Sequence, residues 1–257
     1  MIISSKYKFT FLKNPKTGGS AVHKEFDGLN TIEFSKAPEK PNRFFQSSFT
    51  NAYYGTQQFS LSPHYYNLDF FIDNNIIPGN IEEYTNYVVI REPVDRFMSF
   101  CRHVRKTGSM LHVFFKEQFN NISIEDSLLI SKTGVLTPEI LSRFSTQFKY
   151  YVQSISLQQI AEKAVQTPFD SKGRLDLIRI PQNYYYNDSR VTVIDYANLQ
   201  QEIYALCERH NTKRTYTLPN INVGNRLDGD IFPESLINTI KEIYAEDVEF
   251  YNNLTTK

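Results

Sequence analysis

A short glycine-containing segment near the start of the chain combines the residue types that bind phosphate groups. It reads Asn14-Pro15-Lys16-Thr17-Gly18-Gly19-Ser20, and it separates an alternating polar and apolar run at residues 6–13 from a helical pattern at Ala21–Phe26. Backbone N–H groups of such a loop and of the first helical turn point at an anion, and the helix dipole favours negative charge. Glycine lets a phosphate approach the backbone, lysine adds positive charge, and hydroxyls add donors. We predict an anion site, with a tight Gly-Gly turn beside a solvent-exposed lysine as the alternative.

A second segment with similar chemistry covers residues 86–106. The apolar strand pattern Asn86–Ile90 ends at Arg91, and open α/β sheets bind ligands at the carboxyl ends of their strands. Pro93 suits the first turn of a helix, and Ser99 lies about two turns into it. An arginine at a strand end and a serine on the next helix can together hold a doubly charged phosphate. Pairing of the arginine with a nearby carboxylate is the alternative.

The elements that must position these segments alternate along the chain. Strand patterns cover residues 6–13, Asn86–Ile90, Leu175–Ile180 and Val191–Ile194. Helical patterns cover Ala21–Phe26, the segment from Pro93, residues 107–170 in large part, Leu199–Arg209 and Pro233–Tyr251. Strands that alternate with helices predict an α/β fold with a mostly parallel sheet covered on both sides. We expect a single domain over residues 1–257.

Three of these helices carry apolar stripes that should face a core. The stripes consist of Phe97, Phe100, Cys101 and Val104; of Leu199, Ile203 and Leu206; and of Leu236, Ile240, Ile243 and Tyr251. Ser156 and Gln159 have the spacing of a capping box, in which each side chain accepts a hydrogen bond from the other residue's backbone. This pair predicts a helix that begins directly after Ser156.

The numbers of basic and acidic residues limit the kinds of molecule that the chain is expected to bind. The chain has 257 residues, 28 Lys+Arg and 28 Asp+Glu, which disfavours a dedicated nucleic-acid binder. Locally, residues 1–25 hold five lysines and one glutamate, and residues 91–106 hold five basic and two acidic residues. The neutral total is thus compatible with a site for one small, highly charged nucleotide.

Other features bear on the compartment and on metals. The sequence has no run of about 18 apolar residues, so it predicts no transmembrane helix. The N-terminus also lacks the apolar core of a signal peptide. Cys101 and Cys207 lie far apart, which favours a reducing compartment. No cluster has metal-ligand spacing. We expect a soluble, cytoplasmic protein that needs no metal.

Taken together, the two phosphate-binding segments resemble the sulfotransferase family, most closely its carbohydrate (heparan/chondroitin-type) branch. Residues 13–22, KNPKTGGSAV, are similar to the family's 5′-phosphosulfate loop, and residues 88–99, VVIREPVDRFMS, to its 3′-phosphate motif. Residues 218–224 and 240–247 are similar to its closing loop and helix. The resemblance implies the sulfotransferase fold, a P-loop-like (nucleotide-kinase-like) parallel sheet flanked by helices. It also implies transfer of a sulfuryl group from 3′-phosphoadenosine 5′-phosphosulfate (PAPS), with adenosine 3′,5′-bisphosphate as product.

The resemblance further implies roles for single residues. Lys16 is expected near the bridging oxygen of the phosphosulfate, as a catalytic and cofactor-binding residue. The 5′-phosphate is expected in a cradle of Thr17, Gly18, Gly19, Ser20 and Ala21. Arg91 and Ser99 are expected to hold the 3′-phosphate, and Arg226 in the closing loop is a further candidate. Residues 29–60 and 107–170 show little resemblance to the family. Such divergent stretches build the acceptor sites of family members, and the resemblance implies a hydroxylated acceptor here, such as a glycan.

Transfer to a sugar hydroxyl also needs a general base within hydrogen-bond reach. His64, in the segment Leu61–Leu68, resembles the family segment that supplies the catalytic histidine, and we expect it to take this role. His103 lies in a basic run that could bind an anionic glycan or form a solvated helix face. His23 is expected on a helix surface. His112 and His210 carry no signal.

Two other functions remain as alternatives. A P-loop-like small-molecule kinase would place its lysine after the glycines and an acidic Mg²⁺ ligand at a strand end, and neither is evident. A non-catalytic protein that binds anionic glycans would not need the set of Lys16, Arg91 and Ser99. Sulfuryl transfer therefore accounts for more of the sequence than either alternative.

Overall fold

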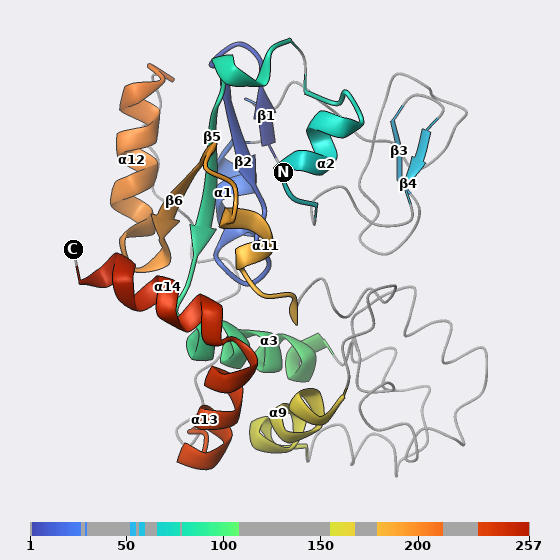
Figure 1. The fold of residues 1–257 in the computed structure, drawn as a ribbon, viewed down its shortest axis with the longest axis vertical. Helices are drawn as coiled ribbons and strands as arrows, with labels where there is room; N and C mark the ends of the chain where they lie inside the picture. Colours follow the sequence, from blue (N-terminus) through green and yellow to red (C-terminus); the bar gives the residue numbers. More distant parts are fainter. Residues whose placement is uncertain are drawn as a thin grey trace. The chain divides into compact units, whose positions relative to one another are not determined.

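The computed structural model describes residues 2–26, 29, 52–54, 57–59, 66–77, 79–107, 155–167, 179–212 and 231–256. The chain divides into two compact units, whose elements are labelled in Figure 1. The first unit consists of Met1–Glu92, Ile180–Ile221 and Phe250–Lys257, and the second of Pro93–Arg179 and Asn222–Glu249. The single domain expected over residues 1–257 stays a prediction.

The first unit is built on a four-stranded sheet (Figure 1). Its strands are β1 (Ile2–Ser4), β2 (Phe9–Leu12), β5 (Thr85–Ile90) and β6 (Val191–Asp195), in the spatial order β1-β2-β5-β6. The last three run parallel, and β1 pairs antiparallel with β2. This mostly parallel sheet flanked by helices confirms the predicted α/β fold.

Helices cover both faces of this sheet. Successive side chains of its central strands point to opposite faces, and the apolar ones on each face need a covering layer. Phe9, Phe11, Tyr87 and Val89 pack against α1 (Gly19–Phe26) and α12 (Leu199–Arg209). Leu12, Val88 and Ile90 share the other core with α2 (Leu68–Asp73), with α11 (Asn183–Tyr186) and with the residues of α14 (Ala245–Thr255) from Phe250 onward. The predicted stripe of Leu199, Ile203 and Leu206 is confirmed, since all three are buried against the sheet.

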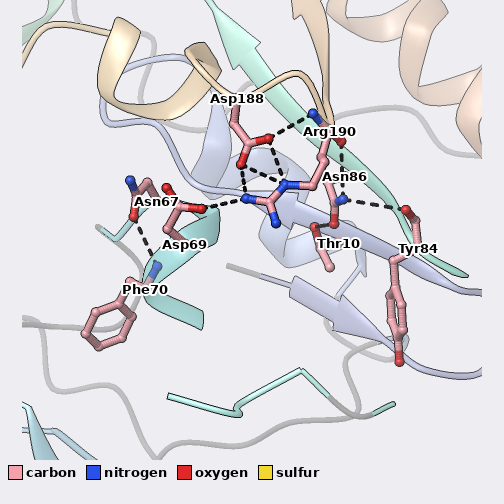
Figure 2. Close-up of polar contacts among 8 residues, drawn as sticks. All are labelled: Thr10, Asn67, Asp69, Phe70, Tyr84, Asn86, Asp188 and Arg190. Atoms are coloured by element: carbon pink, nitrogen blue, oxygen red, sulfur yellow. Dashed lines mark hydrogen bonds and ion pairs between the residues drawn. The ribbon is translucent and has the colours of Figure 1, made fainter. Parts of the chain in front are cut away.

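Polar contacts fasten the amino-terminal ends of the parallel strands (Figure 2). The buried hydroxyl of Thr10 donates to Asn86 Oδ1 at 2.8 Å, and Asn86 Nδ2 donates to the carbonyl of Arg190 at 3.2 Å. The Arg190 guanidinium pairs in turn with Asp188 and with Asp69 of α2, both at 2.6 Å. These bonds link β2, β5 and α2 to the segment that leads into β6. They all lie at the amino-terminal ends of the parallel strands, and the loops that follow β2, β5 and β6 lie at the carboxyl ends.

The second unit contains a small helical core. Its described helices are α3 (Pro93–Thr107), α9 (Leu157–Gln166), α13 (Glu234–Ile243) and the start of α14. The predicted stripe on α3 is buried here with Ile160 and Ala161 of α9 and Ile240 of α13. The predicted capping box is confirmed: Ser156 Oγ accepts from Gln159 N at 3.1 Å, and Gln159 Oε1 accepts from Ser156 N at 2.8 Å.

Short elements complete the described chain. They are the hairpin of β3 (Ala52–Tyr54) and β4 (Gln57–Phe59) and the 3-10 turns η3 (Ile81–Glu83) and η4 (Tyr196–Asn198). No helix within the described ranges is both long enough and apolar enough to cross a membrane.

Two expected strands differ from the structure. The alternation at residues 6–13 runs across a turn at residues 5–8, where Lys8 has φ +53°, so β2 begins only at Phe9 and β1 precedes the turn. The strand expected over Leu175–Ile180 is wrong at its described end, because Arg179 is helical and Ile180 lies in a bend. The Arg179 guanidinium donates to the carbonyls of Ala164 and Thr167 at the end of α9, a tertiary contact that local alternation does not encode.

The expected helix Pro233–Tyr251 is also divided. It breaks at Tyr244, which has φ −112° and ψ 35° and whose buried hydroxyl donates to the Arg179 carbonyl at 2.7 Å. As a result, Leu236 and Ile240 belong to the core of the second unit, whereas Tyr251 packs in the first. The four residues therefore do not form one continuous stripe.

Candidate anion-binding site

Three chain segments leave the carboxyl edge of the sheet side by side. Leu12 pairs with Val88, and Ile90 pairs with Asp195, so β2, β5 and β6 end at the same edge. The loop at residues 13–18 follows β2, Arg91 follows β5, and Tyr196 follows β6. The sequence-predicted loop and Arg91 are thereby brought together.

The loop folds tightly onto itself before α1 begins. Lys16 and Gly18 have φ +67° and +79°, in the left-handed region. Thr17 is buried, and its hydroxyl donates to the Asn14 carbonyl at 2.9 Å. The Gly18 carbonyl then accepts from the N–H groups of Ala21 and Val22, at 2.9 and 3.3 Å. The Thr17 hydroxyl therefore bonds within the loop. The group that Thr17 could offer to a ligand is its backbone N–H.

The loop presents a row of backbone donors. The N–H groups of Thr17, Gly18, Gly19 and Ser20 have no hydrogen-bond acceptor among the residues that the structure describes. They lie at and just before the amino-terminal end of α1, whose first turn has no acidic residue. The helix dipole adds a partial positive charge at the same place. This donor set fits an anionic group such as a phosphate.

Both glycines also lie close to other side chains of the protein. A Cβ on Gly18 would lie 2.8 Å from Leu199 Cδ2 and 3.1 Å from Tyr196 Cε2, in addition to the strain at φ +79°. A Cβ on Gly19 would lie 2.9 Å from Lys13 Cγ. The sequence pattern predicts that these glycines allow close approach of a phosphate. In the structure they also let the loop lie against η4 and α12 and let the Lys13 side chain pack along Gly19.

Arg91 joins the two predicted motifs directly. Its Nη1 donates to the Lys16 carbonyl at 3.1 Å, and its guanidinium carbon lies 4.3 Å from the centre of the Tyr196 ring. The residue is 9% exposed, so the guanidinium is held between the loop and the aromatic ring. Tyr196 carried no sequence signal, because its place over Arg91 depends on the pairing of β5 with β6.

The buried carboxamide of Gln182 holds the backbone of Arg91 on both sides, and we call this pair of bonds the carboxamide clamp. Gln182 Oε1 accepts from Arg91 N at 3.0 Å, and Gln182 Nε2 donates to the Arg91 carbonyl at 2.7 Å. Asn14 Nδ2 donates to the same Gln182 oxygen at 3.0 Å and to the Val89 carbonyl at 2.9 Å. Asn14 and Gln182 are both 1% exposed. Asn14 thus ties the loop to β5.

The other predicted site residues have different positions. Ser20 is exposed and Ala21 is buried on α1. Ser99 is half-buried on α3 in the second unit. His64 and Arg226 lie outside the described residues. In the part of the chain that is described, no three His, Cys, Asp or Glu residues are grouped as metal ligands would be.

His210, which carried no sequence signal, lies in a polar network of the first unit. Its Nδ1 is 2.8 Å from the Tyr7 carbonyl, and its Nε2 is 3.0 Å from the Tyr87 hydroxyl. Burial lowers the pKa of His210, and the Arg209 charge acts in the same direction against the bond to Tyr7. The network joins the β1–β2 turn, β5 and the end of α12 rather than the anion site.

Comparison of the chain with models of protein families, with curated proteins and with solved structures gave no match. The function is therefore inferred from the residues of the site and from the motifs that they form.

Proposed function

We propose that the protein is a sulfotransferase that moves a sulfuryl group from PAPS to the hydroxyl group of an acceptor, with a glycan as the favoured acceptor class. One observation carries the proposal. The segments that resemble the 5′-phosphosulfate loop and the 3′-phosphate motif follow adjacent parallel strands, and Arg91 Nη1 bonds to the Lys16 carbonyl at 3.1 Å. A local resemblance of either segment alone would not require this contact.

The binding roles follow from the donor set. The backbone N–H groups of Thr17, Gly18, Gly19 and Ser20, together with the Lys16 ammonium, would hold the phosphosulfate end of the nucleotide. Arg91 would contribute to the 3′-phosphate, since a guanidinium carries five N–H donors and can serve the loop and a phosphate together. The roles of Ser99 and Arg226 at this phosphate rest on the sequence resemblance.

The proposed chemistry is an in-line displacement at sulfur. His64 takes the proton of the acceptor hydroxyl as the hydroxyl oxygen forms its bond to sulfur. The bond between sulfur and the bridging phosphate oxygen breaks, and adenosine 3′,5′-bisphosphate leaves. Lys16 and the loop N–H groups would stabilise the negative charge that grows on this oxygen.

Thermal unfolding in the presence of nucleotides tests the binding part of the proposal. At a ligand concentration 100 times the dissociation constant, binding stabilises the folded state by about 2.7 kcal/mol. For a chain of this size we expect adenosine 3′,5′-bisphosphate to raise the melting temperature by about 5–10 °C. ATP with Mg²⁺ should have a much smaller effect. Stabilisation by ATP with Mg²⁺ but not by the bisphosphate would favour the kinase alternative.

Transfer of radiolabelled sulfate from PAPS to a panel of glycans, phenols and steroids tests the reaction. Lys16→Asn removes the ammonium while keeping a residue that tolerates φ +67°, and we expect it to abolish transfer. Lys6→Asn on the exposed β1–β2 turn is the matched control and should retain full activity. His64→Ala should lose transfer but keep bisphosphate binding, so full activity of that variant would reject His64 as the base.

A further inference from the structure

Lys13 is the first residue of the loop at residues 13–18, the phosphate loop, and the reaction proposed above gives it no role. It directly follows β2, and its side chain is half-buried. Its Cγ and Cδ lie 2.9 and 3.8 Å from the place that a Cβ on Gly19 would occupy. The Lys13 stem therefore runs along the first residue of α1, and the ammonium is only two bonds beyond Cδ.

The surroundings of this ammonium are uncommon for a lysine. No hydrogen bond or ion pair joins Lys13 to another residue in the described part of the chain. Burial lowers the pKa of Lys13 from 10.5 to about 8. A desolvated ammonium without a counter-ion is unfavourable, so near that pH a fraction of the molecules carries Lys13 as the neutral amine.

The backbone donors of the same loop also lack an anionic acceptor. The N–H groups of Thr17, Gly18, Gly19 and Ser20 have no acceptor among the described residues, and they lie on the segment that the Lys13 stem contacts. A phosphate group bound by these donors places negative charge close to Lys13. A nearby opposite charge favours the charged form of a lysine.

We propose that Lys13 is a second ammonium of the phosphate loop, and that binding of a phosphate-bearing ligand is coupled to uptake of a proton by Lys13 from the buffer. The inference rests on the proposed function only for the identity of the ligand. In the proposed transfer, the charged Lys13 acts with Lys16 to stabilise the leaving phosphate.

Calorimetric titration of the full chain measures this proton uptake. Adenosine 3′,5′-bisphosphate and adenosine 5′-monophosphate are each titrated at pH about 8, in two buffers of different ionisation enthalpy. The phosphate groups of these ligands have a second pKa of about 6, so they are already fully ionised. We expect uptake of about half a proton per bound ligand, because a group with a pKa of about 8 is half charged at this pH.

Two variants at the same position separate charge from structure. Lys13→Arg keeps a permanent positive charge, and we expect it to bind without proton uptake. Lys13→Met should also bind without uptake, and about 10-fold more weakly, since it loses a charge-assisted contact. Lys6→Met, at an exposed position, is the matched control and should keep the uptake of the original protein. Binding without uptake in the original protein, or unchanged uptake in Lys13→Met, overturns the inference.

The two nucleotides distinguish this inference from the proposed function. Lys13-dependent uptake with both, but no preference for the bisphosphate over the monophosphate, supports the role of Lys13 and rejects a PAPS site. Tighter binding of the bisphosphate without proton uptake rejects the role of Lys13 and supports the PAPS site. Absence of binding by both nucleotides rejects both.

Discussion

At the scale of single residues, the candidate site depends most on groups that never need to touch a ligand. Gln182 hydrogen-bonds both the N–H and the carbonyl of Arg91, as a neighbouring strand would. Its oxygen also accepts from Asn14 in the phosphate loop. One buried carboxamide thus fixes the backbone of Arg91 at the end of β5 and the first residues of the loop relative to each other.

Substitution of Gln182 by methionine tests this clamp. Gln182→Met keeps the side-chain length but leaves the N–H and the carbonyl of Arg91 without their Gln182 partners. An unsatisfied buried polar group costs about 1–3 kcal/mol, so we expect the free energy of unfolding in urea to fall by about 3 kcal/mol. Bisphosphate binding should weaken in the same variant, since both halves of the site lose their support.

The matched control for the clamp is Gln158→Met on the exposed face of α9. Among the residues that the structure describes, the Gln158 side chain bonds only to Glu162 one turn away, and such an exposed pair contributes about 0.5 kcal/mol or less. A similar loss of stability in the two variants would show that the effect comes from the substitution itself, and would contradict a special role for Gln182.

At the scale of the elements, the capping box of α9 gives the most direct test. Ser156 Oγ is the acceptor for Gln159 N, and the Gln159 side chain accepts from Ser156 N. We expect Ser156→Ala to lower the free energy of unfolding by about 1 kcal/mol, because an N-terminal N–H loses its partner. Ser235→Ala, at an exposed position in the first turn of α13, should change it by less than about 0.5 kcal/mol. Equal effects at both positions would reject the cap as the cause.

The elements also show what the sequence could predict and what it could not. The apolar stripes of α3 and α12, the helix start at Pro93 and the box at Ser156 depend on neighbours within a few residues, and all are confirmed. At the break, by contrast, the Tyr244 hydroxyl donates to the carbonyl of Arg179, which is distant in the sequence. The helical pattern of Pro233–Tyr251 continues through Tyr244 without interruption, so local periodicity could not locate the break.

The candidate site follows the same division. Lys16, Gly18 and Arg91 could be predicted as site candidates because a glycine-rich loop and a strand-end arginine have recognisable local patterns. Gln182 and Tyr196 were not found, because their roles arise only when β5 pairs with β6 and the chain returns to the edge of the sheet. Sequence patterns therefore indicated candidate ligand-binding groups, but not the residues that hold these candidates in place.

At the scale of the whole molecule, the first unit is assembled from segments that lie far apart in the chain. Parallel strands require long crossover connections, so β2, β5 and β6 meet only after many intervening residues. His210 is one of the residues that connect these distant segments, and we call its polar contacts the His210 joint. It contacts the Tyr7 carbonyl and the Tyr87 hydroxyl, and Arg209 Nη1 donates to the same hydroxyl at 2.9 Å. The neutral imidazole suits this joint, with Nδ1–H donating to the carbonyl and Nε2 accepting from the hydroxyl.

This joint predicts a dependence of global stability on pH. The pKa of His210 is lowered from 6.5, mainly by burial, so below that pH the unfolded chain binds a proton more readily than the folded chain does. The stability that the neutral imidazole contributes is therefore fully present above pH 6.5 and is lost as the pH falls towards the pKa of the folded state. We expect the free energy of unfolding to decrease between pH about 7 and about 5, and to decrease less steeply in His210→Gln. Urea unfolding at a series of pH values measures both slopes. Equal slopes in the two proteins would show that His210 does not couple protonation to folding.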